Sequence, residues 1–406
     1  MGLNTIEKRV ENIRLQIHQP NGTVHHIGHS GPLIDWHLHT PATLRTILKH
    51  PELNLGRSYV RGEWDVDTRQ LPDLVKTLIS KRARVRLLHN RPCLRRLRAR
   101  LPHTHKVDRH PHWQDISAWV SQLCLGEELI QGCALFSEPG MTMEQARRTH
   151  CRRLTARLQL EPAQHVLDLN AGWGATALFL ARTADVRVTA FVRTREQLQF
   201  AKNETRRCGL DGQVHFRLGS FHQCRGHFDR ILATGFLERY PEPTYPVLFK
   251  RFEELLEDDG FAWIQVTGRS RDIAISNRWY QNQLPSGYSL PLISDIASAL
   301  ESTRLRTLLM EEQTSHWQQD LECQAQRYYQ YRAEISQRFG EQRTRHWEFQ
   351  LASQATAVRW GQLRHYELLL GNTRCIWPAY EPGLDPSVAD LPWDIIDRIP
   401  GLARDI

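Results

Sequence analysis

The stretch HVLDLNAGWGATALFLARTA (165–184) decides the fold of this 406-residue chain. Its first six residues, HVLDLN, include Val166, Leu167 and Leu169 and end in Asn170, which predicts a buried strand of a parallel sheet. Gly172 and Gly174 then permit a tight turn, because glycine adopts backbone conformations that other residues avoid. The apolar residues that follow have the spacing of a helix. Strand, glycine turn and helix in this order predict the first unit of an α/β sheet.

The same alternation of strand and helix continues after residue 184. Helices are predicted over 194–210 and 245–260, each between two apolar runs. The strands are predicted over 165–170, 186–192, 214–219, 228–237 and 261–268. Five strands joined by helices predict a doubly wound, Rossmann-like parallel sheet. In such a sheet the ligand lies beyond the carboxyl ends of the strands, so the candidate site residues are those that follow each strand.

Composition divides the chain into four parts. Residues 1–80 mix short strand and helix patterns and predict a small N-terminal α/β domain. Residues 81–112 are a basic linker, and residues 113–270 are a helical stretch followed by the sheet. Residues 271–406 are rich in helix patterns and in tryptophan and tyrosine, so we expect a helical cap and C-terminal tail over the edge of the sheet.

The positive charge is concentrated in residues 81–107, which hold ten Lys and Arg residues and no acid. The formal charge of the whole chain is +8, so the remainder is slightly acidic. Leu94, Leu97 and Leu101 stand at helical spacing among the arginines, which predicts a basic amphipathic helix. Such a helix fits an anionic membrane surface, and nucleic acid is the other phosphate-bearing partner. A solvated helix that packs its leucines on a domain core is the competing interpretation.

Several classes of protein are disfavoured by what the sequence lacks. It has no run of 18 apolar residues, and its N-terminus lacks the apolar core of a secretory signal, so we expect a cytoplasmic protein. The eight cysteines form no C-x-x-C pair, which predicts reduced thiols and no zinc ribbon. His103, His105, His110 and His112 could suggest a metal site, but their spacing in a proline-rich stretch without Cys, Asp or Glu ligands favours a linker, so no metal site is predicted.

The glycine turn distinguishes between two classes of cofactor. A dinucleotide turn has the pattern G-x-G-x-x-G and an acid about twenty residues later, whereas this turn is N-A-G-W-G and strand 186–192 is followed by Arg193 and Thr194. S-adenosylmethionine is the alternative for this topology, since it has no pyrophosphate to hold. The glycine pattern alone is also compatible with tight packing that binds nothing.

From Leu55 to Leu370 the chain resembles the cyclopropane-fatty-acyl-phospholipid synthases, which use S-adenosylmethionine to modify double bonds in membrane lipid acyl chains. The resemblance is carried by collinear motifs: LGRSYVRGEWD (55–65), CALF (133–136) with the helix 143–160, HVLDLNAGWGATALFLA (165–181), Glu196-Gln197, FDRILATGFLERYPEPTY (228–245), LPSGYSLP (284–291) and HWEFQLASQATAVRWGQLRHYELLL (346–370), the last matching the family's final helices. The resemblance implies a dimer and a peripheral position on the inner face of the cell membrane.

The resemblance also implies roles for individual residues. The residues that would bind S-adenosylmethionine are Asp168, Asn170, Ala171, Gly172, Gly174, Thr194, Gln197, Ser220 and Phe221. The residues that would hold a bicarbonate ion, the base that removes a proton after methyl transfer, are Cys133, Glu238, Gln265 and Trp317.

Several of these positions depart from the family pattern. Asn170-Ala171 replaces a Gly-Cys pair, Gln131-Gly132 replaces Tyr-Ser, and Ser220 replaces an acid. Gln265 and Trp317 stand where the family has a histidine and a tyrosine. An amide carries no charge, and an indole has a single N–H, so both changes alter what the site offers an anion.

Three functions follow from these observations. The first is methyl or methylene transfer from S-adenosylmethionine to unsaturated phospholipid acyl chains, giving a cyclopropane or a methylated alkene. The second is a catalytically impaired paralogue that binds lipid or pairs with an active homologue, in a homodimer or heteromer. The third, a nucleic-acid methyltransferase, is disfavoured because no N-P-P-[YF] motif is present. Structural roles compete at two residues: Cys133 as a small buried hydrophobe and Glu238 as the ion-pair partner of Arg239.

Overall fold

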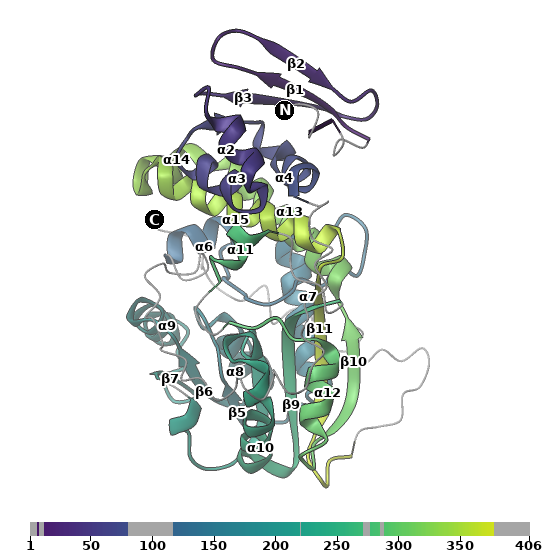
Figure 1. The fold of residues 1–406 in the computed structure, drawn as a ribbon. Coiled ribbons are helices and arrows are strands. Elements are labelled where there is room, and N and C mark those ends of the chain that lie inside the picture. Colours follow the sequence, from purple (N-terminus) through teal and green to yellow (C-terminus); the bar gives the residue numbers. More distant parts are fainter. Residues whose placement is uncertain are drawn as a thin grey trace. The chain divides into compact units, whose positions relative to one another are not determined.

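The computed structural model describes residues 6–7, 12–79, 117–219, 221–270, 277–284 and 288–376 (Figure 1). The contacts between these residues divide the chain into two compact units. Unit 1 contains the described residues of 1–113, 270–286 and 321–363, and unit 2 contains those of 114–269, 287–320 and 364–406. The chain therefore passes from unit 2 to unit 1 at residue 270 and returns to unit 2 at residue 287. The predicted basic linker 81–112 lies outside the described residues.

Unit 1 combines a small sheet with helices from both ends of the chain. Its strands are β1 (Arg14–His18), β2 (Val24–Ile27), β3 (Leu33–Leu38) and β4 (Trp64–Asp65), in the order β2-β1-β3-β4. Its helices are α2 (Thr43–Lys49), α3 (Pro51–Val60), α4 (Leu71–Ile79), α11 (Arg278–Gln281), α14 (Arg332–Phe339) and α15 (Glu341–Arg359), with the short helix η1 (Thr68–Gln70) before α4. β1 pairs in parallel with β3 and antiparallel with β2.

Helix α15 joins the two ends of the chain within unit 1, because it packs on α3 and α4. The Tyr59 hydroxyl donates a hydrogen bond to the buried carboxylate of Glu348 on α15 (2.7 Å), and Arg332 Nε donates to the other oxygen of that carboxylate (3.0 Å). A buried carboxylate with two such donors is stabilised in place. Residues almost 290 positions apart therefore form one folded unit.

Unit 2 contains a seven-stranded sheet in the order β10-β11-β9-β8-β5-β6-β7. The strands are β5 (His165–Asp168), β6 (Arg187–Val192), β7 (Val214–Leu218), β8 (Phe228–Thr234), β9 (Leu256–Arg269), β10 (Arg306–Glu312) and β11 (Leu363–Gly371). The pairs from β7 to β9 are all parallel, whereas β10 and β11 are antiparallel. The predicted doubly wound α/β sheet is confirmed, and each of its five predicted strands is present.

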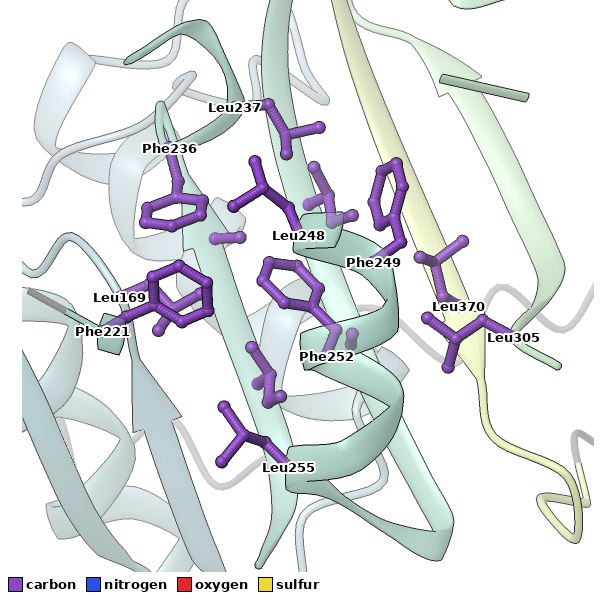
Figure 2. Close-up of a cluster of buried hydrophobic side chains, with 14 of the residues drawn as sticks. Leu169, Phe221, Phe236, Leu237, Leu248, Phe249, Phe252, Leu255, Leu305 and Leu370 are labelled. Atoms are coloured by element: carbon purple, nitrogen blue, oxygen red, sulfur yellow. The ribbon is translucent and has the colours of Figure 1, made fainter. Parts of the chain in front are cut away.

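Helices cover both faces of this sheet. They are α6 (Ala118–Leu125), α7 (Met143–Arg157), α8 (Ala175–Ala184), α9 (Arg195–Arg207), α10 (Tyr245–Leu255) and α12 (Ile293–Leu300), with the short helices η4 (Phe221–Gln223), η5 (Leu237–Arg239) and η6 (Glu242–Thr244), while α13 (Thr314–Gln330) begins in unit 2 and ends in unit 1. Buried side chains of α10 share one apolar cluster with the strands (Figure 2). Residues of α12 belong to the same cluster, and those of α7, α8 and α9 share another.

Alternate residues of the central strands point to opposite clusters. On β9, Ala262 and Ile264 belong to the α10 cluster, whereas Phe261 and Trp263 belong to the α7 cluster. This alternation is the period of two that a strand imposes on its side chains. Gln265 follows Phe261 and Trp263 in this alternation, so it lies on the face covered by α7.

Two expectations for secondary structure are wrong. Residues 363–370 form strand β11 instead of the final helix, and residues 306–312 form β10, so the region after 270 supplies two strands to the sheet as well as helices. Leu, Glu and Arg favour a helix in isolation, but Leu368, Leu369 and Leu370 are buried on both faces of the sheet, which stabilises the strand. The stretch 113–160 is only partly helical, since a loop joins α6 to α7.

Two further observations concern membrane-spanning helices and cysteines. Among the described residues, no helix is long and apolar enough to cross a bilayer. The seven cysteines in the described part of the chain are all free thiols, as the sequence predicts.

Candidate active site

The turn after β5 is held by hydrogen bonds to its two neighbouring strands. Ala171 N donates to the Phe191 carbonyl of β6 (2.9 Å), and Asn170 Nδ2 donates to the Thr234 carbonyl at the end of β8 (2.8 Å). Asn170 N donates to Asp168 Oδ1 (3.1 Å). The polar residues of the turn therefore fix its position at the carboxyl edge of the sheet, where an α/β sheet binds its ligand.

The two glycines of the turn have positive φ and are closely packed by other side chains. Gly172 has a φ of +57°, and a Cβ there would lie 2.0 Å from the side-chain oxygen of Gln131. Gly174 has a φ of +93°, and a Cβ there would lie 2.6 Å from Phe216. Gln131, which precedes the predicted Gly132-Cys133 pair, thus lies directly over the turn. Trp173 between the glycines is buried and stacks edge-on against Phe200.

Asp168 ends β5 as a buried carboxyl group. Burial raises its pKa to about 7, and the hydrogen bond from Asn170 only partly opposes this. A buried carboxyl that titrates near neutral pH is typical of a binding or catalytic site. Positive charge placed beside it would favour the ionised form.

The predicted residues at the ends of β6 and β7 have structural contacts. The Thr194 hydroxyl caps α9 by accepting a bond from Gln197 N (3.0 Å), and the buried Gln197 side chain accepts one from Arg193 N (3.1 Å). Phe221 packs edge-on against Phe236 in the α10 cluster (Figure 2). Ser220 lies outside the described residues. These residues shape the edge of the sheet, and their role toward a cofactor stays a prediction.

Glu238 lies in the short helix after β8 and is 2% exposed. Its Oε1 accepts a hydrogen bond from the backbone N–H of Thr267 on β9 (2.6 Å), while Oε2 has no partner among the described residues. Burial raises the pKa of Glu238 to about 7, and the Thr267 bond and the charge of Arg239 lower it only in part. Arg239 itself donates to Asn170 Oδ1 at 3.5 Å. Glu238 can therefore both hold and release a proton near neutral pH.

Cys133 and Trp317 meet at Gln313. The Cys133 thiol donates to the Gln313 carbonyl (3.8 Å), and Trp317 N donates to the same oxygen (3.0 Å). Burial raises the pKa of the Cys133 thiol well above its usual value, so the group is a neutral thiol. The Trp317 ring lies 5.4 Å from the His365 ring on β11. The structure thus brings these two predicted residues together.

Gln265 is joined to the same region by a buried polar network. Its Nε2 lies 2.6 Å from Glu367 Oε1 on β11 and 3.3 Å from His150 Nε2 on α7. A Cβ on Gly132, the residue before Cys133, would lie 2.7 Å from Gln265 Oε1. Three of the four predicted catalytic residues are therefore linked through shared neighbours, and Glu238 is bonded to β9 two residues beyond Gln265.

Charged residues of α7 that the sequence analysis did not select complete this network. Arg147 forms a buried ion pair with Asp320 (2.6 Å), and Arg153 pairs with Glu311 and, at 3.3 Å, with Glu367. Arg147, His150 and Arg153 recur every three residues, which places them along one side of a helix. The sequence signal that could have identified them is this three-residue spacing of polar side chains in MEQARRTHCRRLTAR, on a helix face that is buried.

An apolar hollow lies elsewhere in unit 2, between α8 and α9. It encloses about 690 Å³, counting the part open to solvent, and its lining includes Ile130, Trp173, Phe179 and Phe200. None of the four predicted catalytic residues lines it. The polar groups at the carboxyl edge of the sheet are therefore the better candidate for a reaction site.

Comparisons with known proteins identify the family and the fold of the chain. The family model described as mycolic acid cyclopropane synthetase matches residues 102–368. The chain is 25% identical over 281 residues to the cyclopropane-fatty-acyl-phospholipid synthase of Escherichia coli K12, covering 66% of this chain and 69% of that protein. It is 26% identical over 358 residues to the tuberculostearic acid methyltransferase of Mycobacterium tuberculosis, covering 82% of each.

Solved structures show the same fold. The mycolic acid cyclopropane synthase CmaA1, in a complex with SAH and CTAB, has a TM-score of 0.60 at 18% identity, covering 64% of this chain and 95% of that one. Coclaurine N-methyltransferase, bound to N-methylheliamine and SAH, has a TM-score of 0.63 at 18% identity, covering 80% of this chain and 99% of that one. At these identities the likeness establishes the fold.

Proposed function

Because this chain belongs to the mycolic acid cyclopropane synthetase family, we propose that it is an S-adenosylmethionine-dependent methyltransferase that acts on the double bond of unsaturated phospholipid acyl chains. The observation that carries the proposal is a glycine turn hydrogen-bonded to the strand end that precedes Glu238, a buried carboxyl with a pKa near 7. A cofactor turn and a proton-accepting group at one edge of the sheet are what methyl transfer followed by proton loss requires.

The residues of the turn fit S-adenosylmethionine. The positive φ of Gly172 and Gly174 gives the sharp turn that brings the chain from β5 into α8, and the amides at the start of α8 point toward the turn. Gln131 offers a side-chain amide above Gly172, and Asp168 is a buried carboxyl whose ionised form a sulfonium charge would favour. When bound, S-adenosylmethionine supplies an electrophilic methyl group. The cradle would be held by Asp168, Asn170 to Gly174, and Gln131.

Glu238 is suited to receive the proton that the substrate loses. After the alkene carbon bonds to the methyl group, the substrate carries a positive charge that is discharged by losing a proton. At neutral pH a large share of Glu238 is ionised, and its Oε2 is not engaged by a described residue. Proton loss from the new methyl group gives a cyclopropane, and loss from a neighbouring chain carbon gives a methylated alkene.

Membrane association and assembly belong to the same proposal. A phospholipid substrate requires that the enzyme reach a bilayer surface, and the basic segment 81–107 supplies charge for an anionic surface. Replacing Arg95, Arg96 and Arg98 with glutamine should weaken binding to anionic vesicles, and added salt should do the same for the native protein. A homodimer, or a heteromer with a homologue, is expected from the family resemblance and is tested by light scattering.

The direct test is calorimetric titration of the purified protein with S-adenosylmethionine and with its demethylated product. Micromolar binding, followed by a mass increase of one methyl or methylene group in unsaturated phospholipid, would support the proposal. The variant E238Q should bind the cofactor normally but form no product. A folded protein that gives no heat of cofactor binding at high concentration would refute the proposal. That result would favour the alternative of a catalytically impaired paralogue.

A further inference from the structure

A polar hollow lies at one edge of the seven-stranded sheet, where α9 and β7 line it. This β7-edge hollow encloses about 810 Å³, counting the part open to solvent. β7 is the last strand in the order of the sheet, so its outer edge pairs with none of the described strands. The lining includes four basic residues and one acid, namely Lys202 and Arg206 on α9, His215 and Arg217 on β7, and Asp211 between these elements. The hollow therefore has a net positive charge.

The basic side chains of the hollow are not neutralised by the described part of the chain. There, the side chains of Lys202 and Arg217 have no hydrogen bond or ion pair, and Arg206 donates to the neutral side chain of Asn203 (3.1 Å). Arg304, an exposed arginine elsewhere in unit 2, is by contrast paired with an acid. Lys202 and Arg206 stand four residues apart on α9, a spacing at which like charges repel each other. An anion bound in the hollow would relieve this repulsion.

Positive charge continues onto the neighbouring strands. The segment 187–227 holds eight Lys and Arg residues and three acids, whereas the chain outside residues 81–107 is slightly acidic as a whole. The effect is seen at His165 on β5. Burial lowers the pKa of His165, the charges of Arg187 and Arg217 lower it further, and Asp229 opposes them only in part. The hollow is therefore part of a wider basic surface.

Basic side chains at the edge of a sheet can also have a protective role. The unpaired N–H and C=O groups of an edge strand can pair with another chain, and charged side chains on the strand prevent this. Arg217 on β7 is placed for such protection. Lys202 and Arg206 are not on the strand, although they line the same hollow. Charges that converge on one hollow from a helix and a strand indicate a ligand.

The chemistry of the lining favours a phosphate group in a lipid headgroup. Guanidinium and ammonium groups both bind phosphate. Leu218, next to Arg217, is 44% exposed, and an apolar side chain beside basic ones suits the interface of a bilayer. Single-stranded nucleic acid would need exposed aromatic rings for base stacking, but the phenyl ring in the described lining, that of Phe216, is buried. A phospholipid is therefore a better ligand than nucleic acid.

We propose that the β7-edge hollow binds the phosphate group of an anionic phospholipid through Lys202, Arg206 and Arg217, so that unit 2 contacts the bilayer at this edge. The choice of a lipid as the source of the phosphate rests on the proposed function above. β7 ends at the carboxyl edge of the sheet, where the candidate active site lies. A headgroup held in the hollow keeps the bilayer beside that edge, in addition to any contact made by residues 81–107.

The test measures co-sedimentation of the full-length protein with vesicles of phosphatidylcholine and phosphatidylglycerol at physiological salt. K202Q, R206Q and R217Q together should weaken binding at least about tenfold. The matched control combines K250Q, R304Q and R374Q, which removes the same charge from exposed positions elsewhere in unit 2. It should bind within about twofold of the native protein, because salt screens distant charges. Equal losses in the two variants would overturn the inference.

The contribution of the basic segment 81–107 is separated by a second set of variants. A protein that carries R95Q, R96Q and R98Q should still bind the anionic vesicles, although more weakly than the native protein. Adding K202Q, R206Q and R217Q should then remove the remaining binding. If the first three substitutions alone abolish binding, the hollow contributes nothing and the inference is overturned.

The two competing roles of the hollow predict other results. If the role is protective, K202Q, R206Q and R217Q should make the protein self-associate in light scattering, while its monomer binds vesicles as the native protein does. If the ligand is nucleic acid, a single-stranded oligonucleotide should bind more tightly than the vesicles, and the same variant should lose that binding. Either result would overturn the assignment to a phospholipid.

Hydrogen exchange of the native protein provides a check without substitutions. Anionic vesicles should slow the exchange of amides at the free edge of β7, whereas vesicles of phosphatidylcholine alone should not. Unchanged exchange at β7 in vesicle-bound protein would overturn the inference. None of these measurements requires turnover. A protein that binds vesicles through the hollow but forms no lipid product would therefore contradict the proposed function and leave this inference standing.

Discussion

Asn170 Nδ2 donates a hydrogen bond to the Thr234 carbonyl oxygen at 2.8 Å, which ties the turn after β5 to the end of β8. Thr234 is followed by Gly235, whose φ is +58°, and then by the short helix that carries Glu238. The predicted cofactor turn and the predicted proton acceptor are therefore parts of one hydrogen-bonded edge. A substitution that displaces the turn should therefore also displace the segment that carries Glu238.

The first prediction concerns this bond. N170A removes it and leaves the partly buried carbonyl of Thr234 without this donor, which should cost about 1–3 kcal/mol. We expect the affinity for S-adenosylmethionine to fall about tenfold and turnover to fall with it. N170D should fare no better, because a carboxylate cannot donate to a carbonyl. Calorimetric affinities close to the native value in both variants would contradict the role given to Asn170.

Gly172 should not tolerate a side chain. In G172A the new Cβ would meet the Gln131 side chain at 2.0 Å, and the φ of +57° is itself strained for alanine. Cofactor affinity should fall at least about tenfold. G212A is the matched control, because a Cβ there meets nothing within 4 Å. The double variant G172A with Q131A should recover part of the loss, since the contact is relieved while the backbone strain remains.

The pH dependence of turnover should follow Glu238. Its pKa is raised to about 7, so the protonated form, which cannot accept a proton, predominates below that pH. Turnover should rise with pH and reach half its maximum near pH 7. E238Q should lower turnover about 100-fold or more and remove this rise. A pH profile of E238Q that matches the native one would assign the ionisation to another group.

Stability should show the opposite dependence on pH. Asp168 and Glu238 both have a folded-state pKa of about 7, above their ordinary values, so between about pH 4 and 7 the folded chain holds protons that the unfolded chain has released. The unfolding free energy should therefore fall as the pH rises toward 7 and beyond. D168N should flatten this fall, whereas D211N, at an exposed position, should not. Thermal unfolding at pH 5 and pH 8 makes the comparison.

The buried Arg147–Asp320 pair should contribute more to the free energy of unfolding than the partly exposed Arg251–Glu254 pair. Both side chains are almost fully buried, so D320A would leave an uncompensated guanidinium in the interior and should cost about 3–5 kcal/mol. The Arg251–Glu254 pair is partly exposed, so E254Q should cost less than about 1 kcal/mol. Chemical denaturation followed by a probe in unit 2 measures both. Similar losses for the two variants would show that burial of the first pair does not determine its contribution.

The five strands from 165 to 268, the helices between them and the glycine turn were all predictable, because each is encoded in a short local pattern of apolar residues and glycines. Glu238 and the turn could be placed at one edge for the same reason, since the carboxyl ends of parallel strands share an edge. β10 and β11 escaped prediction. Their residues favour helix locally, and only pairing between segments more than 50 residues apart makes them strands.

The contacts of the site were decided by the tertiary structure. Nothing near Gln265 in the sequence shows that its amide will meet His150, 115 positions before it, and Glu367, 102 positions after it. The sequence determined which strands form and therefore which residues reach the edge, because strand patterns are local. The fold determined which polar groups surround Gln265 there, because the pairing of β9 with β11 and the packing of α7 bring them together from distant parts of the sequence.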